Sequence, residues 1–389
     1  MKHLIAFPDL IYNGGGYYDD VVSIGDCFQL NHLSPSPAKL EGVLFKNATR
    51  PAADFNIYGS TEEFRTQVRD NNNYIAKTHQ VAPQSIALSI ENCYLYKGVI
   101  YRPAHEGLDV LHETYRSNDR AWTHHLDFEN ANPNVSVTLD DSSRIYLYIG
   151  SVGSSNYGHW LIDDLPRGKY LQQIEHPCTV VLDSFGSAID AVKTESLRSV
   201  ISGAEVDFKF VSPNDVVHFP TLHYVTPVSF HPFIKNRFAM DFARSIAEGS
   251  KPANPSPKKR LFVERDAARY RRLLNNSDVA SLLEGLGFTI VDPEKLSFHE
   301  QMNLFAAADV IVGVMCAAMA NTIFSPPKSK IIYLSPIDWY EPFYWDLAAT
   351  MSHDYHAIYG AREGKVPEPF LDDFVIDVDV LRQVIASVP

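Results

Sequence analysis

The sequence has few cysteines, no long apolar segment and no excess of basic residues. The 389 residues include only four cysteines, widely separated and without a C-x-x-C pair: Cys27, Cys93, Cys178 and Cys316. This pattern fits neither a disulfide framework nor a zinc site. The longest apolar run, Val310–Ala320, is shorter than the ~20 residues that a membrane-spanning helix needs. A net charge of −13 argues against general nucleic-acid binding and against binding to an anionic membrane surface.

The length and composition are typical of globular proteins with a sizeable core. Hydrophobic residues make up 45% of the chain and charged residues 21%, and 389 residues are enough for two domains. The apolar run Leu4–Phe7 near the start is too short for a signal peptide. We therefore expect a soluble, cytoplasmic protein with no transmembrane segment and no nucleic-acid partner. Nothing in the sequence favours a particular oligomeric state.

From residue 144 onward, short apolar runs alternate with segments of helical periodicity. Ile145–Ile149 and Thr179–Asp183 have the character of buried strands, and Ser187–Ser202 that of a helix. The alternation restarts after a proline-rich segment, with strands expected at 260–264, 288–291, 309–312 and 330–334. This pattern predicts an α/β fold with two Rossmann-like, doubly wound domains, 1–232 and 233–389, facing a cleft. The linker is expected at about 251–257, and the C-terminal helix could pack back on the first domain.

A polar cluster follows the first of these strands. The segment 156–167, Asn-Tyr-Gly-His-Trp-Leu-Ile-Asp-Asp-Leu-Pro-Arg, comes after a small polar turn, which predicts a helix N-terminus. On a helix, His159, Asp163 and Arg167 are spaced i, i+4 and i+8, so we expect them to share one face. Pro166 should bend or end that helix. The His–Asp pair can be a local hydrogen bond or a base with its orienting carboxylate, and the spacing leaves both open.

Basic residues gather after the first strand beyond the linker. Four arginines stand shortly after the strand expected at 260–264: Arg265, Arg269, Arg271 and Arg272. Arginines at the end of a strand suit bidentate phosphate binding, and a solvated basic loop is the alternative. Farther along the chain, Ser297 and Glu300 have the spacing of a capping box at the start of a helix.

Four motifs in this order resemble the family 61 glycosyltransferases, which occur in bacterial capsular and exopolysaccharide gene clusters and in plants and animals. The segment 156–167 is similar to their G-H-W-x-x-D-x-L-P-R block, and 271–275 to their R-R-x-x-N block. Ser297–Gln301 is similar to S-F-x-E-Q, and 313–321 takes the place of G-x-H-G-A-x-x-x-N. The resemblance covers roughly residues 144–334 and does not extend to the first hundred residues.

The resemblance implies a GT-B type fold and an inverting, metal-independent glycosyl transfer without a cofactor. The first domain would bind a saccharide acceptor and the second a nucleotide-sugar, with a UDP-sugar as the first candidate, in polysaccharide biosynthesis. The group transferred would be hexosyl, pentosyl or N-acetylhexosaminyl.

The resemblance also assigns roles to particular residues. His159 and Asp163 would be catalytic, one of them as the base and the other as its partner. Acceptor contacts are expected from Asn156, Trp160 and Arg167. Donor contacts are expected from Arg265, Arg271, Asn275, Gln301, Met315, Cys316 and Asn321.

The sequence also departs from the family. Met315 and Cys316 stand where the family carries a His-Gly pair, which is expected near the donor nucleotide. This departure is consistent with an alternative, a catalytically weakened saccharide- or nucleotide-binding protein of the same fold, although the retained arginine, asparagine and His–Asp elements favour an enzyme. An α/β-hydrolase-like enzyme is a weaker alternative, because no G-x-S-x-G elbow occurs. Asp377 and Asp379 match the D-x-D spelling of metal-dependent glycosyl transfer, but we expect Asp379 to be the N-cap of the last helix.

Overall fold

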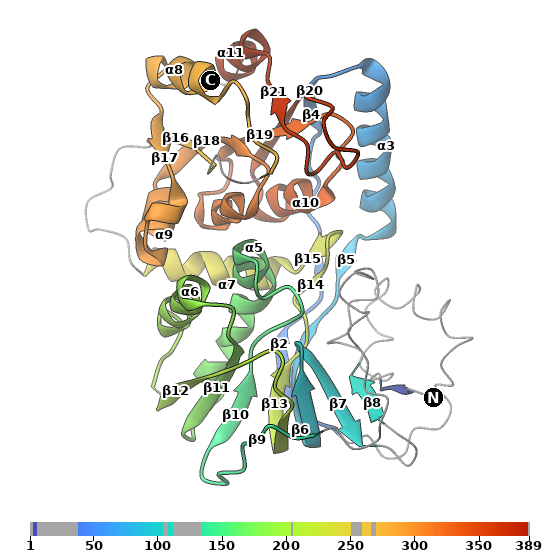
Figure 1. The fold of residues 1–389 in the computed structure, drawn as a ribbon, viewed down its shortest axis with the longest axis vertical. Helices are drawn as coiled ribbons and strands as arrows, with labels where there is room; N and C mark the ends of the chain where they lie inside the picture. Colours follow the sequence, from blue (N-terminus) through green and yellow to red (C-terminus); the bar gives the residue numbers. More distant parts are fainter. Residues whose placement is uncertain are drawn as a thin grey trace. The chain divides into compact units, whose positions relative to one another are not determined.

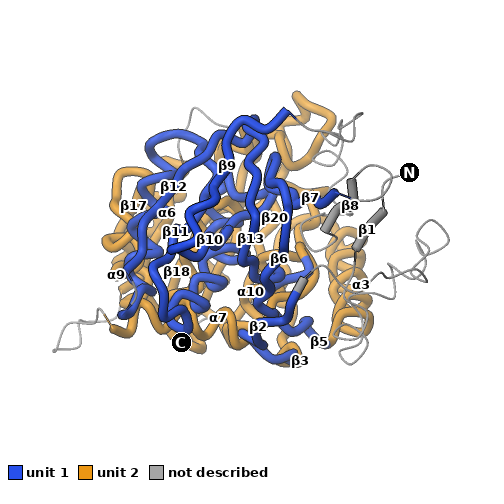
Figure 2. The backbone as a smooth tube through the Cα atoms, turned by 90° about the horizontal axis from the view of Figure 1, so that it is seen from below, with its two compact units in different colours: residues 1–48, 81–230 blue, residues 49–80, 231–389 orange. Residues whose placement is uncertain are grey.

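The computed structural model describes residues 3–5, 38–103, 108–111, 134–203, 205–249, 259–265 and 270–387. The chain forms two compact units, which Figure 2 shows in different colours: residues 1–48 with 81–230, and residues 49–80 with 231–389. We call them unit 1 and unit 2. The units divide between residues 230 and 231, next to the expected end of the first domain at 232. The linker expected at about 251–257 and Arg269 lie outside the described residues.

Unit 1 is built on a mixed sheet in the order β1-β8-β7-β6-β13-β10-β11-β12 (Figure 1). Strands β13, β10, β11 and β12 run parallel, whereas β6, β7 and β8 continue the sheet antiparallel. Strand β11 is buried at every position, as expected for a parallel strand that is covered on both faces. The main elements are β1 His3–Ile5, β2 Ala38–Phe45, β6 Ser85–Tyr96, β7 Val99–Pro103, β8 Leu108–Leu111, β9 Val137–Thr138, β10 Ile145–Tyr148, β11 Cys178–Asp183, α6 Ser187–Arg198, β12 Val206–Val211 and β13 Val217–Val225.

Unit 2 is built on a sheet in the order β17-β16-β18-β19-β20-β21. Its strands pair parallel as far as β20, and only β21 joins antiparallel. The predicted α/β class with parallel sheets is therefore confirmed. The strands are β16 Lys259–Val263, β17 Thr289–Val291, β18 Ala308–Val314, β19 Lys330–Pro336, β20 Asp354–Arg362 and β21 Phe374–Val375. The helices of unit 2 beyond residue 231 are α7 Arg237–Glu248, which precedes β16, and then α8 Asn276–Gly285, η5 Pro293–Lys295, α9 Phe298–Ala306, η6 Ala317–Phe324, α10 Pro342–Met351 and α11 Val378–Ala386.

Alternating side chains of the unit 2 strands serve two cores. Val310, Val312 and Val314 share a cluster with residues of α8 and α11. Gly313 points the other way, where a Cβ would come within 2.5 Å of the Met319 sulfur on η6. Helices therefore cover both faces of this sheet, which is the doubly wound arrangement. Helix α11 packs on α8 within unit 2, and the return of the C-terminal helix to the first domain remains a prediction.

Residues 49–80 belong to unit 2, whereas the sequence predicts them in the first domain, 1–232. Strand β4, Asn56–Gly59, adds to β20 in parallel, and α3, Glu62–Thr78, follows it. A buried charge cluster holds the segment: Arg50 Nε donates to Asp346 at 2.6 Å, and Lys235 Nζ reaches the other oxygen of that carboxylate at 3.0 Å. Four short strands lie where the chain passes between the units: β3 Ala48–Thr49, β5 Val81–Ala82, β14 Ser229–Phe230 and β15 Ile234–Lys235.

Local sequence signals correspond closely to several helix ends. The Ser297 hydroxyl accepts from the Glu300 amide and the Glu300 carboxylate from the Ser297 amide, which confirms the capping box. The last helix is capped by Asp377, not by Asp379 as predicted, because the chain enters the helix two residues earlier. Within the described ranges, no helix is both long and apolar enough to cross a membrane.

His353 provides a stability prediction for unit 2. Its side chain is buried, its Nε2 lies 3.3 Å from the Ser325 carbonyl oxygen, and burial lowers its pKa from 6.5 to about 4. The unfolded chain therefore binds more protons between these two values, and stability falls as pH drops through that window. From pH 7 to pH 5 the loss due to this residue should be about 2 kcal/mol.

We expect His353→Gln to remove this part of the acid sensitivity. Urea unfolding of the parent and the variant at pH 7 and pH 5 measures it. An equal loss of stability in both proteins between the two pH values would show that His353 is not the group responsible.

Candidate active site

The segment 156–167 is helical, but it is not one regular α-helix. A turn of α-helix, α5 Tyr157–His159, passes into a π-helical turn, η3 Trp160–Asp164, and then into a 3-10 helix, η4 Leu165–Gln173. The Asn156 side chain caps the start by accepting from the amides of Gly158 and His159. Pro166 lies in the first turn of η4, so the predicted change near this proline is confirmed. Turns of π-helix occur frequently at functional sites.

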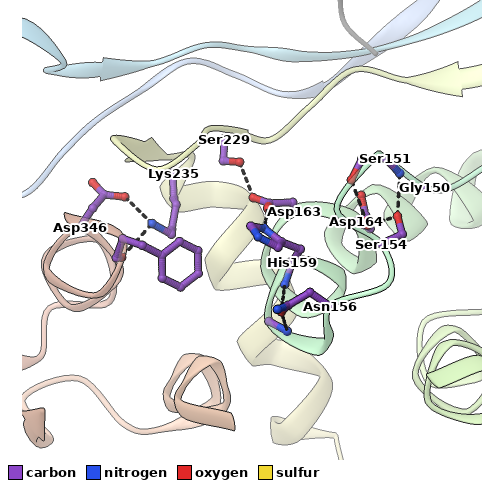
Figure 3. Close-up of polar contacts among 12 residues, drawn as sticks. Gly150, Ser151, Ser154, Asn156, His159, Asp163, Asp164, Ser229, Lys235 and Asp346 are labelled. Carbon is purple, nitrogen blue, oxygen red and sulfur yellow. Dashed lines mark hydrogen bonds and ion pairs between the residues drawn. The ribbon is translucent and has the colours of Figure 1, made fainter. Parts of the chain in front are cut away.

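His159 and Asp163 form the pair that the spacing predicted. His159 Nδ1 lies 2.8 Å from Asp163 Oδ2, and the Ser229 hydroxyl donates to the other oxygen of that carboxylate (Figure 3). The Asp163 side chain is 3% exposed and the His159 imidazole 22% exposed. With Asp163 ionised, Nδ1 must carry the proton that it donates, which leaves the lone pair on Nε2. The arrangement therefore offers a partly exposed base held in one tautomer by a buried carboxylate.

Arg167 does not share this face, contrary to the prediction. It is 1% exposed, and its Nη2 forms an ion pair with Asp164 and also donates to the Gly150 carbonyl at 2.7 Å, while Nη1 donates to the Val225 carbonyl at 3.1 Å. Asp164 also accepts from the Ser154 hydroxyl at 2.6 Å (Figure 3). Burial opposes the charge of the guanidinium, but Asp164 outweighs it and raises the pKa of Arg167. Arg167 thus ties the 3-10 helix to the ends of β10 and β13.

Trp160 also belongs to the core of unit 1. The side chain is fully buried, and its indole nitrogen donates to the Ser196 hydroxyl of α6 at 3.0 Å. Trp160 and Arg167 are thus enclosed in the core, where they position the helix, and the acceptor contacts expected from them remain predictions. Asn156 is the acceptor candidate that remains at the surface.

In unit 2, candidate residues gather where neighbouring parallel strands end. Arg265 and Arg271 follow β16, Cys316 follows β18, and Trp339 follows β19. Because β16, β18 and β19 are adjacent and parallel, the loops after them leave the same edge of the sheet. This edge is where open α/β sheets bind ligands.

Arg271 is the unusual member of this group. It is 7% exposed, its backbone is in the left-handed region with φ 56°, and its Nε has no hydrogen-bond partner. Its Nη1 donates to the Phe370 carbonyl at 2.8 Å, and its guanidinium carbon lies 4.0 Å from the centre of the Trp339 ring. Burial lowers its pKa, and among the described residues no carboxylate forms an ion pair with it. A buried cation without an anion is costly, so this site favours an anionic ligand.

The neighbouring arginines differ in this respect. Arg272 is exposed, and its Nε and Nη2 reach Asp373 Oδ2 at 2.8 and 2.5 Å. Arg265 donates to the Arg271 carbonyl at 3.2 Å, and its guanidinium carbon lies 4.9 Å from the centre of the Tyr270 ring. Arg265 and Arg271 therefore lie side by side, whereas Arg272 is occupied by a structural ion pair.

Four of the expected donor contacts stabilise the protein chain. Asn275 bridges the backbone of Ile376, donating to its carbonyl at 2.8 Å and accepting from its amide at 3.1 Å. Asn321 donates to Gln301 at 2.8 Å, and both side chains are buried. Met315 is fully enclosed in the core, whereas Cys316 is partly exposed at the start of η6. Arg265, Arg271 and Cys316 remain as candidates for contact with a donor.

The D-x-D spelling near the C-terminus is a helix cap. Asp377 accepts from the amides of Asp379 and Val380, at 2.9 and 3.3 Å, and Asp379 pairs with Arg382. Both carboxylates are therefore committed to α11, which leaves no reason to assign a metal to them.

Two residues of the site were missed from the sequence. Ser229 lies 66 positions from the carboxylate that it contacts, and no local pattern marks it. Trp339 was predictable in principle, since it is an aromatic residue just after the strand expected at 330–334 and thus at the ligand-binding edge.

Comparisons with known proteins identify the family that the central part of the chain resembles. Residues 157–332 match the family model described as Glycosyltransferase 61. Alpha-1,3-arabinosyltransferase XAT2 of rice, Oryza sativa subsp. japonica, is 25% identical over 126 residues, which cover 30% of this chain and 20% of that protein. The chain thus spans about a fifth of the length of this relative.

Two bacterial structures show weaker similarity. The iron-containing dodecameric glycosyltransferase TibC of enterotoxigenic E. coli gives a TM-score of 0.26 at 13% identity, covering 53% of this chain and 62% of its own. The E. coli heptosyltransferase WaaC with ADP gives a TM-score of 0.30 at 10% identity. The match covers 63% of this chain and 99% of the WaaC chain.

The buried ion pair of Arg167 makes a stability prediction. We expect Arg167→Met to lower the free energy of unfolding by about 3–5 kcal/mol, because Asp164 is left buried without its cation. Adding Asp164→Leu should restore much of this loss, since the uncompensated charge is then gone. Denaturant unfolding of the single and double variants measures both effects.

Arg382→Met is the matched control, because it removes an arginine from an exposed ion pair with Asp379. The control should stay close to the parent. A loss in Arg167→Met no larger than in the control would contradict the structural role of Arg167.

Proposed function

We propose, from the match of residues 157–332 to the glycosyltransferase 61 family, that the chain transfers a sugar from a nucleotide-sugar donor to a saccharide acceptor. In this proposal unit 2 binds the donor and unit 1 activates the acceptor. The observation that carries it is the buried guanidinium of Arg271, which lacks a described acidic partner at the ligand-binding edge of a parallel sheet.

The donor diphosphate supplies an anion to Arg271, for which the described residues provide no carboxylate partner. Arg271 and Arg265 can donate to its oxygens, and guanidinium groups match phosphate geometry with two parallel hydrogen bonds. The amides at the start of η6, next to Cys316, add donors at a helix N-terminus. These groups stabilise the charge that develops on the leaving diphosphate, so the proposed reaction is metal-independent.

His159 is the proposed general base in unit 1. Asp163 is nearly enclosed and already accepts from two donors, which suits an orienting role better than proton abstraction. Nε2 of His159 takes the proton of an acceptor hydroxyl, and the oxygen attacks the anomeric carbon as its bond to the diphosphate breaks. Attack opposite the leaving group inverts the anomeric configuration. Asn156, near the base, is the proposed acceptor contact.

The proposed type of donor sugar is based on the name of one relative. The rice relative is named as an arabinosyltransferase, so a pentosyl donor is the first to test, followed by hexosyl and N-acetylhexosaminyl donors. We propose a UDP-sugar as the donor, a role in polysaccharide biosynthesis and a cytoplasmic location, as expected from the sequence.

One observation favours a second candidate, a binding protein with little turnover. Met315 is buried and its thioether is only a weak acceptor, so it offers a donor nucleotide no strong hydrogen bond. The Cys316 thiol is also only a weak hydrogen-bond donor. Such a protein would bind the nucleotide-sugar through Arg271 but would not release the nucleotide.

We expect His159→Ala and Asp163→Asn each to reduce kcat by about 10²–10⁴-fold, the usual contribution of a general base. Ser229→Ala should cost less, about tenfold, because it removes one charge-assisted hydrogen bond to the carboxylate. Initial rates at saturating donor and acceptor measure these effects. His299→Ala, at an exposed site on α9, is the control and should retain the parent rate. Turnover near the parent level in both His159→Ala and Asp163→Asn would rule out this pair.

We expect Arg271→Ala to weaken nucleoside-diphosphate binding by about ten- to a hundredfold, because it removes a charge-assisted contact to phosphate. Nucleoside binding should change much less. Calorimetry with both ligands measures the difference, and Arg272→Ala is the matched control, since Arg272 already pairs with Asp373. Equal losses for nucleoside and nucleoside diphosphate would show that Arg271 does not contact phosphate.

A further inference from the structure

Trp339 lies at the carboxyl edge of the unit 2 sheet, and the two residues before it make fixed contacts. It comes three residues after the end of β19. The Ile337 amide donates to the Gly360 carbonyl at 2.9 Å, and the Asp338 carboxylate lies 3.6 Å from Arg362. Asp338 has a left-handed backbone with φ 68°, which turns the chain sharply before the tryptophan. The indole is therefore anchored through its backbone beside the loops that follow β18 and β16.

The indole is partly exposed and stacks on Arg271, which has no ion-pair partner among the described residues. The Arg271 guanidinium carbon lies 4.0 Å from the ring centre, within the range of a cation–π contact. In the part of the chain that the structure describes, no other ring or cation stacks on Trp339. The site thus presents a phosphate-binding group and an aromatic surface in direct contact.

This combination matches the two ends of a nucleotide. A nucleoside diphosphate carries an anion, which suits Arg271, and a flat base, which can stack on an aromatic ring. Every base has a π-face, so stacking binds bases without strong selection among them. Inorganic pyrophosphate has only the anion and a nucleoside only the base, so each should use half of the site.

We propose that Trp339 is the stacking platform for the nucleobase of the donor, with Arg271 at its side holding the diphosphate. The proposal rests on the proposed function of unit 2 as the donor-binding unit. It adds a base-binding residue, and it predicts that base and phosphate affinity depend on different side chains. The competing explanation is that Trp339 only orients Arg271, in which case its removal acts through phosphate affinity.

The test compares pyrophosphate, UDP and ADP as ligands of the full chain by calorimetry. Trp339→Ala should lower the affinity for UDP and for ADP by about ten- to a hundredfold, which is the range expected for loss of base stacking. Its affinity for pyrophosphate should change by less than about threefold. Trp339→Phe keeps a stacking ring and should recover most of the affinity. Tyr270 is 54% exposed and is the second aromatic ring in contact with the Arg271 guanidinium. Tyr270→Ala should therefore lower UDP affinity less than Trp339→Ala does. Circular dichroism and thermal unfolding establish that each variant is folded.

The outcomes separate this proposal from the one it rests on. If folded Trp339→Ala binds UDP as the parent does, or loses pyrophosphate and UDP affinity equally, the platform is refuted while nucleotide binding by Arg271 stands. A larger loss for Tyr270→Ala than for Trp339→Ala also refutes the assignment to Trp339. If the folded parent binds neither UDP nor ADP, both the proposed donor site in unit 2 and the stacking role of Trp339 are refuted.

Discussion

The charged guanidinium of Arg271 is costly in free energy, because burial removes its hydration. The side chain is nine-tenths buried, and among the described residues no carboxylate pairs with it. Two other arginines of the chain show the usual solutions. Arg167 is buried with Asp164, and Arg272 is exposed with Asp373. Arg271 instead has one carbonyl acceptor and the face of Trp339, and its left-handed backbone adds strain. An anionic ligand would supply the negative charge that balances Arg271. For this reason we propose that the donor diphosphate binds beside Arg271.

Unit 1 meets a different requirement, which is to hold a base in one orientation. The buried Asp163 fixes the His159 tautomer, and Ser229 fixes Asp163 in turn. Beneath them, the ion pair of Arg167 with Asp164 anchors the π-helical turn to the sheet. The adjacent carboxylates therefore have separate tasks: Asp163 serves the surface imidazole and Asp164 serves the core.

Residue spacing predicted the contacts that depend on one helical turn, and it failed over longer distances. The His159–Asp163 pair and the Ser297–Glu300 capping box were both predicted correctly from local spacing. Arg167 was misplaced because i, i+8 spacing keeps one face only in a continuous α-helix, and here a π turn and a 3-10 helix intervene. The strand order of parallel α/β units follows from alternation, but the pairing of β4 with β20 joins residues about 300 positions apart, and no local pattern encodes it. Similarly, Asn275 and Gln301 look like ligand-binding amides in a motif, and only the fold shows that the backbone and Asn321 use them.

The most direct test of the account is to incubate the purified chain with a panel of nucleotide-sugars and oligosaccharide acceptors, with a chelator present, and to measure nucleotide release and the anomeric configuration of the product. The account predicts that one donor is consumed with stoichiometric release of its nucleoside diphosphate and that the product has the inverted configuration. Nucleotide-sugar binding that depends on Arg271 but gives no acceptor-dependent release would contradict the assignment as an enzyme and leave a binding protein.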